Sequence, residues 1–161
     1  MRIWFDTEFY ENGETIRLIS IGAVREDGAE YYAETFNSRE LAHASEWLSA
    51  NVAPHLTVAF PSERKSRADI ARDLIAFAGP SPEFWAYYAD YDWVVLCQLF
   101  GRMIDLPKGW PMWCRDLKQL ASYHGVTLPV QEGVEHHAMA DAKWARDATL
   151  WCESYVREPA S

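Results

Sequence analysis

Two carboxylates, Asp6 and Glu8, stand two positions apart in a β-branched and aromatic segment that predicts a strand over 2–9. Alternate side chains of a strand point to the same face, so we expect both acids on one face with Cα atoms about 6–7 Å apart. A buried, unpaired carboxylate costs several kcal/mol, and a divalent cation between the two would remove that cost. The alternative interpretation is an edge strand with a solvated polar face, or one salt-bridged acid.

A third acid lies on the last predicted helix, over 138–157. Asp141 forms one stripe with Ala145, Ala148 and Cys152, and such small residues favour close approach to a sheet. Asp141 is therefore expected on the packing face, with His136 just before the helix. An acid that merely complements the helix dipole in the first turn is the alternative.

A fourth acid comes from the middle of the chain, where a helix is predicted over 90–100. Asp92 shares a stripe with Val95, Leu96 and Leu99, which favours a buried position. Asp90 is placed to cap the N-terminus of that helix. The helix is apolar nearly all round, so periodicity separates the two acids only weakly, and we favour Asp92 for chemistry and Asp90 for the cap.

These four acids offer only oxygen ligands, a set that suits Mg²⁺ or Mn²⁺ better than zinc or copper. His136 would then be free to act as a general base, with His137 as the second candidate, exposed or in contact with substrate. The net charge of −9 by itself argues against a nucleic-acid partner. Two bound divalent cations would remove that objection at the site, because their positive charge would attract phosphate there.

The elements that must position these residues change character along the chain. The first third predicts an antiparallel meander of three strands, and strands and helices alternate after it. The class is therefore α/β, a mixed five-stranded sheet flanked by helices. The predicted strands cover 2–9, 15–25, 29–36, 83–89 and 112–114. The predicted helices cover 38–51, 66–78, 90–100, 115–124 and 138–157, with a Pro-containing loop over 54–62.

Length and composition indicate the general class of protein. A chain of 161 residues with 49% hydrophobic and 24% charged residues predicts a single globular domain over 1–161. Three cysteines without CxxC spacing argue against a disulfide framework or zinc site and favour a reducing compartment. The sequence has no apolar run of membrane-spanning length and no signal-peptide segment, so we expect a cytoplasmic protein without a membrane partner.

Three segments, FDTEF (5–9), YDWVVL (91–96) and HHAMADA (136–142), resemble in this order the motifs of the DEDDh 3′–5′ exonucleases. The spacing from His136 to Asp141 matches the HxxxxD form of that family. The segments RLISIG (17–22) and WCRDLKQLA (113–121) extend the resemblance, which is nearest to the small actinobacterial RNase T-like enzymes of the RNase AS type. Relatives often carry Gly or Thr soon after the DxE, whereas Phe9, Tyr10 and Glu11 follow here.

The resemblance implies an RNase H-like fold and roles for matching residues. Asp6, Glu8, Asp92 and Asp141 would hold two Mg²⁺ ions, with Mn²⁺ as a substitute, and His136 would deprotonate the attacking water. Because relatives often work as dimers, the resemblance also implies that this protein forms a homodimer.

Four substrate contacts are predicted: Thr7, Phe9, His136 and Arg67. Phe9 is the best candidate to stack on a base because it directly follows Glu8. Tyr10 and Trp93 are weaker candidates, and for Trp93 a place in the hydrophobic core is favoured. Arg67 belongs to a basic cluster with Arg64 and Lys65, which could follow a phosphate backbone or simply be a solvated helix start.

The predicted function is a divalent-metal-dependent 3′–5′ exoribonuclease that hydrolyses single-stranded RNA to nucleoside 5′-monophosphates, with adenylate-rich 3′ ends as one candidate substrate. The first alternative is a 3′–5′ DNA exonuclease of proofreading or repair type, since contacts to the 2′-OH decide between ribose and deoxyribose. A non-catalytic nucleic-acid-binding module and a small-molecule phosphoesterase are further alternatives.

Overall fold

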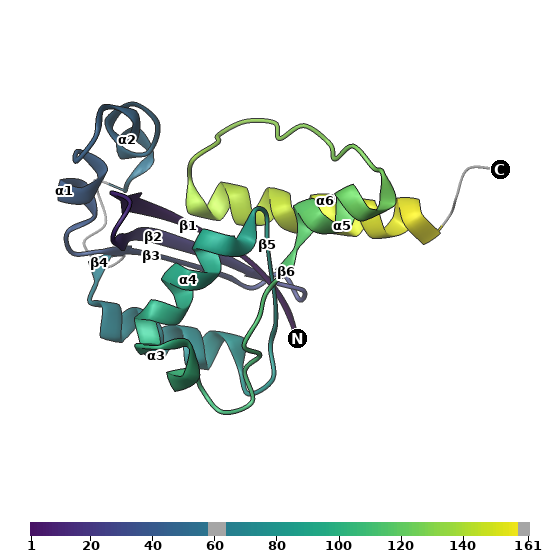
Figure 1. Ribbon diagram of the computed structural model, residues 1–161, viewed down its shortest axis with the longest axis horizontal. Coiled ribbons are helices and arrows are strands. Elements are labelled where there is room, and N and C mark those ends of the chain that lie inside the picture. The colour runs from purple at the N-terminus through teal and green to yellow at the C-terminus, as the bar shows by residue number, and fades with distance from the viewer. Residues whose placement is uncertain (58–63, 158–161) are drawn as a thin grey trace.

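A six-stranded mixed sheet forms the centre of the computed structural model, which describes residues 1–57 and 64–157 (Figure 1). The strands are β1 (Arg2–Glu11), β2 (Ile16–Arg25), β3 (Glu30–Thr35), β4 (Arg64–Lys65), β5 (Glu83–Ala86) and β6 (Arg115–Asp116), in the order β4-β3-β2-β1-β5-β6. Strands β1, β2 and β3 form the predicted antiparallel meander, and β5 pairs in parallel with β1. The site acids of β1 therefore lie in the middle of the sheet.

The predicted strand count was wrong by one, because β4 adds a sixth strand at the edge. It has two residues and pairs in parallel with β3, so it is too short to leave a periodic signal. The predicted strand at 112–114 was also displaced, since β6 begins only after it, at Arg115. There Asp116 ends the strand and accepts a hydrogen bond from Gln119 N (2.9 Å), which starts the next helix.

Helices cover both faces of the sheet: α1 (Ser38–Ala42), α2 (Glu46–Asn51), α3 (Arg67–Ala78), α4 (Ala89–Phe100), α5 (Leu117–His124) and α6 (Ala138–Arg157). Two 3₁₀ turns, η1 (Ala53–His55) and η3 (Met103–Asp105), are also present. The predicted helix over 38–51 is two helices, because Ser45 accepts a hydrogen bond from Leu48 N and begins α2. The predicted loop over 54–62 lies outside the described residues beyond residue 57.

The two faces of β1 pack against different helices, as its alternation predicts. Ile3 and Phe5 join the core beneath α3 and α4, whereas Trp4 packs with residues of α5 and α6 (Figure 1). Asp6 and Glu8 continue the row that begins with Trp4, so they lie on the side of α6. None of the helices in the described part of the chain has the length and apolar character needed to cross a membrane.

A glycine sets the distance between α6 and the sheet at the acids. Gly22 on β2 is the register partner of Asp6, and a Cβ built on it would lie 2.4 Å from the backbone of Ala138. The first turn of α6 therefore rests directly on β2, which brings Asp141 next to β1. A register shift between Glu8 and Phe9 marks a bulge at the same place, a feature that often re-aims side chains near active sites.

Candidate active site

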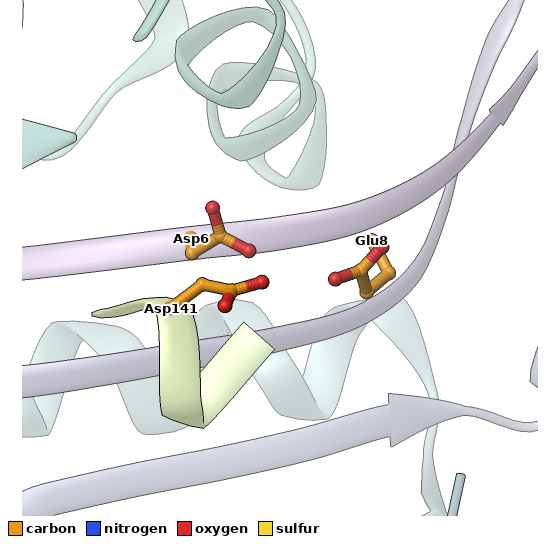
Figure 2. Close-up of side chains that lie close together, drawn as sticks. All are labelled: Asp6, Glu8 and Asp141. Atoms are coloured by element: carbon orange, nitrogen blue, oxygen red, sulfur yellow. The ribbon is translucent and has the colours of Figure 1, made fainter. Parts of the chain in front are cut away.

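Three carboxylates converge where β1 meets the start of α6. One carboxylate oxygen from each of Asp6, Glu8 and Asp141 lies within 4.8 Å of the others, and Figure 2 shows the side chains turned toward one another. Glu8 is 8% exposed. Glu8 and Asp141, which are 133 positions apart in the sequence, thus meet in one acidic cluster, and their role as metal ligands stays a prediction.

The fourth predicted acid, Asp92, lies beside this cluster but is held by another partner. Its Oδ1 accepts hydrogen bonds from the backbone N (2.8 Å) and Oγ1 (2.6 Å) of Thr7, and the side chain is buried. Asp92 lines the same cavity as the other three acids and contributes to raising the pKa of Asp6. Thr7 therefore positions Asp92, while its predicted contact with substrate stays a prediction.

Burial raises the pKa of all four acids, and the charges of neighbouring acids add to this effect at Asp6, Glu8 and Asp92. Desolvation raises the pKa of Asp6 well above its usual range, and the charges of its acidic neighbours raise it further. Burial, followed by the charges of Asp141 and Asp92, raises the pKa of Glu8 to about 8. Burial raises the pKa of Asp92 to about 6 against the hydrogen bonds from Thr7, and it also raises the pKa of Asp141. Four acids destabilised as anions form a site that a cation would stabilise.

His136 stands at the edge of the cluster in a left-handed conformation, with φ of 60°. Such a backbone is uncommon outside glycine and often occurs at functional sites. Its imidazole packs edge-to-face with the Trp47 ring, with ring centroids 4.8 Å apart. Burial raises the pKa of Asp141, and a positive charge on His136 opposes that rise. The predicted general base is therefore next to the predicted metal ligands.

The neighbouring His137 has a structural role. Its Nδ1 accepts a hydrogen bond from Met139 N (3.2 Å) at the start of α6, and its ring stacks on the Tyr32 ring with centroids 5.0 Å apart. Burial lowers the pKa of His137, which favours the neutral ring that this hydrogen bond requires. His137 is half-buried rather than exposed, and of the two histidines only His136 lines the cavity over the acids. The role of His136 as general base stays a prediction.

The predicted cap of α4 was wrong. The helix begins at Ala89, one residue before Asp90, and the backbone N of Ala89 donates to Asp116 Oδ2 (2.7 Å). The capping acid thus comes from β6, 27 positions along the chain, and no local pattern could reveal it. Tyr88 precedes the helix in a left-handed conformation, with φ of 54°.

An aromatic cavity of about 300 Å³ opens over the four acids. Phe9, the predicted base-stacking residue, lines it and stacks on Tyr91 with ring centroids 5.6 Å apart. Trp47 of α2 forms another part of the wall and is 54% exposed. Sequence reasoning missed Trp47, because a lone aromatic in a short helix carries no signal, and missed Tyr91 although it directly precedes Asp92.

The other predicted aromatic contacts lie elsewhere. Trp93 packs in the core against Phe5 and Phe84, as the favoured interpretation had it. Tyr10 packs against the apolar cluster that α1 and α2 form with β2.

The residues of the basic cluster, Arg64, Lys65 and Arg67, contact other residues of the same chain. Arg64 and Lys65 form ion pairs with Glu34 (3.8 Å) and Asp73 (2.7 Å), respectively. Arg67 donates to the carbonyl oxygen of Gln98 (2.7 Å) and does not line the cavity over the acids. Its predicted contact with substrate stays a prediction.

Gln131 was also missed by sequence reasoning. Its Nε2 donates to Asp141 Oδ1 (2.5 Å) and to the carbonyl oxygen of Val134 (2.8 Å). The loop between α5 and α6 is thus bonded directly to a cluster acid. A polar residue in an irregular loop offers no periodicity, so only the folded structure reveals this contact.

By fold, the chain is similar to nucleases. It aligns with E. coli exonuclease I, crystallised with a dT13 oligonucleotide, at a TM-score of 0.60 and 15% identity, covering 97% of this chain and 42% of that chain. The Neurospora crassa Pan2 catalytic unit, with protease and nuclease domains, gives a TM-score of 0.57 at 14% identity, covering 97% and 27%. The chain therefore spans less than half the length of these structures, which confirm the predicted RNase H-like fold.

Sequence comparison identifies the particular family. The 3′–5′ exoribonuclease Rv2179c of Mycobacterium tuberculosis (strain H37Rv) is 40% identical over 148 residues, covering 89% of this chain and 88% of the relative. The model of the 3′–5′ exoribonuclease Rv2179c-like domain matches residues 1–152. The chain belongs to this family, which confirms the predicted resemblance and the predicted class of enzyme.

Proposed function

We propose that this chain is a divalent-metal-dependent 3′–5′ exonuclease that hydrolyses single-stranded RNA. The observation that carries the proposal is the convergence of Asp6, Glu8 and Asp141 within 4.8 Å, beneath a cavity large enough for about one nucleotide. A non-catalytic binding module would gain nothing from such a cluster, because buried like charges destabilise the fold.

The donor set fits hard divalent cations. Carboxylate oxygens are the ligands that Mg²⁺ and Mn²⁺ prefer, and the raised pKa values of Asp6 and Glu8 support a site that gains from a bound positive charge. Asp6, Glu8 and Asp141 would hold a cation directly, and Asp92 would join a second one. When bound, such cations supply Lewis acidity toward a phosphoryl oxygen and lower the pKa of water.

His136 would act as the general base. Its backbone conformation places the imidazole at the mouth of the acidic cluster, and the Trp47 ring supports one edge. An imidazole can accept a proton from water near neutral pH. The resulting hydroxide would form a bond to phosphorus while the bond to the 3′ oxygen of the preceding nucleotide breaks. That oxygen takes up a proton from water, so the shortened strand ends in a 3′-hydroxyl and the released nucleotide carries a 5′-phosphate.

The aromatic wall suits unpaired bases. Each base stacked on an aromatic side chain contributes about 1–3 kcal/mol, and the exposed face of the Phe9–Tyr91 stack and Trp47 offer such surfaces. This arrangement supports a single-stranded substrate, and the family supports RNA. The proposal also includes four predictions from the sequence. They are action on adenylate-rich 3′ ends, a contact between Arg67 and the substrate, a homodimer and a cytoplasmic location.

The test is a ladder assay with 5′-labelled oligo(A) RNA and the matching DNA, each with Mg²⁺, Mn²⁺ or EDTA. We expect shortening from the 3′ end of the RNA, faster than of the DNA and abolished by EDTA. The substitution Asp6→Asn should abolish it and His136→Ala should slow it at least 100-fold, while His124→Ala on the surface of α5 serves as the matched control. Full-length RNA with every metal would refute the proposal, and faster cleavage of DNA would favour the DNA-exonuclease alternative.

A further inference from the structure

A second, larger cavity begins at the same acids. It has a volume of about 600 Å³ and shares Asp6, His136 and Asp141 with the smaller cavity. Its other walls come from α5, α6 and the loop between them, which arches from the end of α5 to the start of α6 (Figure 1). A substrate anchored at the acids can therefore extend from one cavity into the other.

The larger cavity offers surfaces that suit a nucleobase. Trp144 lies edge-on to Tyr87 at 4.8 Å, and its Nε1 donates to the carbonyl oxygen of Pro129 (3.2 Å) in the loop. The indole is thus fixed from two sides while it lines the cavity together with Leu128 and Val126. A fixed aromatic ring beside an apolar floor is the environment in which an unpaired base stacks.

Backbone strain is concentrated at the junction of the cavities. Tyr88 and His136 are the two non-glycine residues with positive φ among the residues that the structure describes, and both line both cavities. Tyr88 is 59% exposed. Strain of this kind persists where the surrounding structure demands a particular side-chain position.

A lysine in the wall of the larger cavity suits a phosphate. Lys118 of α5 lines the larger cavity, whereas the charged side chains of the smaller one, His136 aside, are all acids. Within the described part of the chain Lys118 forms no ion pair, in contrast to Lys65 and Lys143, which pair with acids. Three acids, Asp6, Glu135 and Asp141, also line the larger cavity. Among the described residues that line it, Lys118 is the only lysine or arginine.

We propose that the larger cavity binds the second nucleotide from the 3′ end of the substrate, with its base against Trp144 and its 5′-side phosphate beside Lys118. The inference rests on the proposed function, which places the scissile phosphate at the acids and the terminal nucleotide in the smaller cavity beside Phe9. The second nucleotide lies on the other side of that phosphate, where the larger cavity begins.

The test measures equilibrium binding, in Mn²⁺, of an oligo(A) pentanucleotide whose last linkage carries a CH₂ group in place of the bridging oxygen and cannot be cut. Trp144→Leu should weaken binding about 5- to 150-fold, the range for one stacked base. Lys118→Ala should reduce the slope of log K against log salt by about 0.7, the value for one phosphate contact on a single strand. Lys108→Ala, on an exposed loop outside both cavities, is the matched control and should bind as wild type does.

Modified probes assign the nucleotide. Removing the base of the second nucleotide should cancel the effect of Trp144→Leu, and a neutral methylphosphonate on its 5′ side should cancel the effect of Lys118→Ala. Wild-type binding by both variants would overturn the inference, as would cancellation only when the terminal base is removed. Because Lys118 is exposed, its variant tests the cavity even if Trp144→Leu fails to fold. An inactive wild-type protein that shows these binding differences would refute the proposed function and leave the subsite standing.

Discussion

Replacing Glu8 with Gln should change how the stability of the metal-free protein depends on pH. Burial and the charges of Asp141 and Asp92 raise the pKa of Glu8 from 4.5 to about 8. The folded state therefore holds this proton more tightly than the unfolded state. It follows that the free energy of unfolding falls as the pH rises from about 4.5 through about 8.

The size of the effect follows from the same pKa values. At 1.36 kcal/mol per pKa unit, a rise from 4.5 to about 8 is worth up to about 5 kcal/mol above pH 8, of which about 4 kcal/mol develops between pH 5 and pH 9. Relaxation of the acidic cluster reduces this figure, so we expect about 2–4 kcal/mol. The neutral amide of Glu8→Gln has no such penalty, so the variant should gain that much stability relative to wild type over this range.

The assay is denaturant unfolding followed by tryptophan fluorescence at pH 5, 7 and 9 in EDTA. The exposed Glu14→Gln serves as a matched control and should follow wild type at each pH. With saturating Mn²⁺ the order should reverse, because the cation stabilises the folded wild type by mass action and the variant lacks a ligand. A constant stability difference between Glu8→Gln and wild type across the three pH values would refute the reasoning.

Three further substitutions test how the acids are positioned. Gly22→Ala should cost about 1–3 kcal/mol of unfolding free energy in denaturant titrations, because its Cβ would clash with the backbone of Ala138; unchanged stability would contradict the close approach. Thr7→Val should raise the pKa of Asp92 above about 6 in carboxyl-carbon NMR titrations of metal-free protein, since the lost hydroxyl stabilises the anion; a lowered pKa would oppose this account. Gln131→Ala should weaken Mn²⁺ binding in calorimetry about 10- to 100-fold, as loss of an outer hydrogen-bond partner does, and an affinity equal to that of wild type would remove its positioning role.

Local patterns predicted the parts of this molecule that repeat along the chain. The alternation of β1 placed Asp6 and Glu8 on one face, and the small-residue stripe of α6 placed Asp141 on the packing face. Both follow from a periodicity that the sequence displays directly. The predicted bounds of α6 match the structure for the same reason.

The features that were missed depend on contacts between distant segments. Asp116 replaces Asp90 at the start of α4, and Gln131 reaches Asp141 from an irregular loop. Trp47 meets His136 only because α2 lies near the start of α6. Such contacts are set by tertiary packing and leave no periodic signal in the chain.

The central claim is that Asp6, Glu8 and Asp141 form a divalent metal centre. Its most direct test is an anomalous difference map from crystals of this protein grown with Mn²⁺, measured above and below the manganese absorption edge. We predict a strong peak between the three carboxylates, and its loss in Asp141→Asn crystals prepared in the same way. A map with no peak between them at saturating Mn²⁺ would contradict the account.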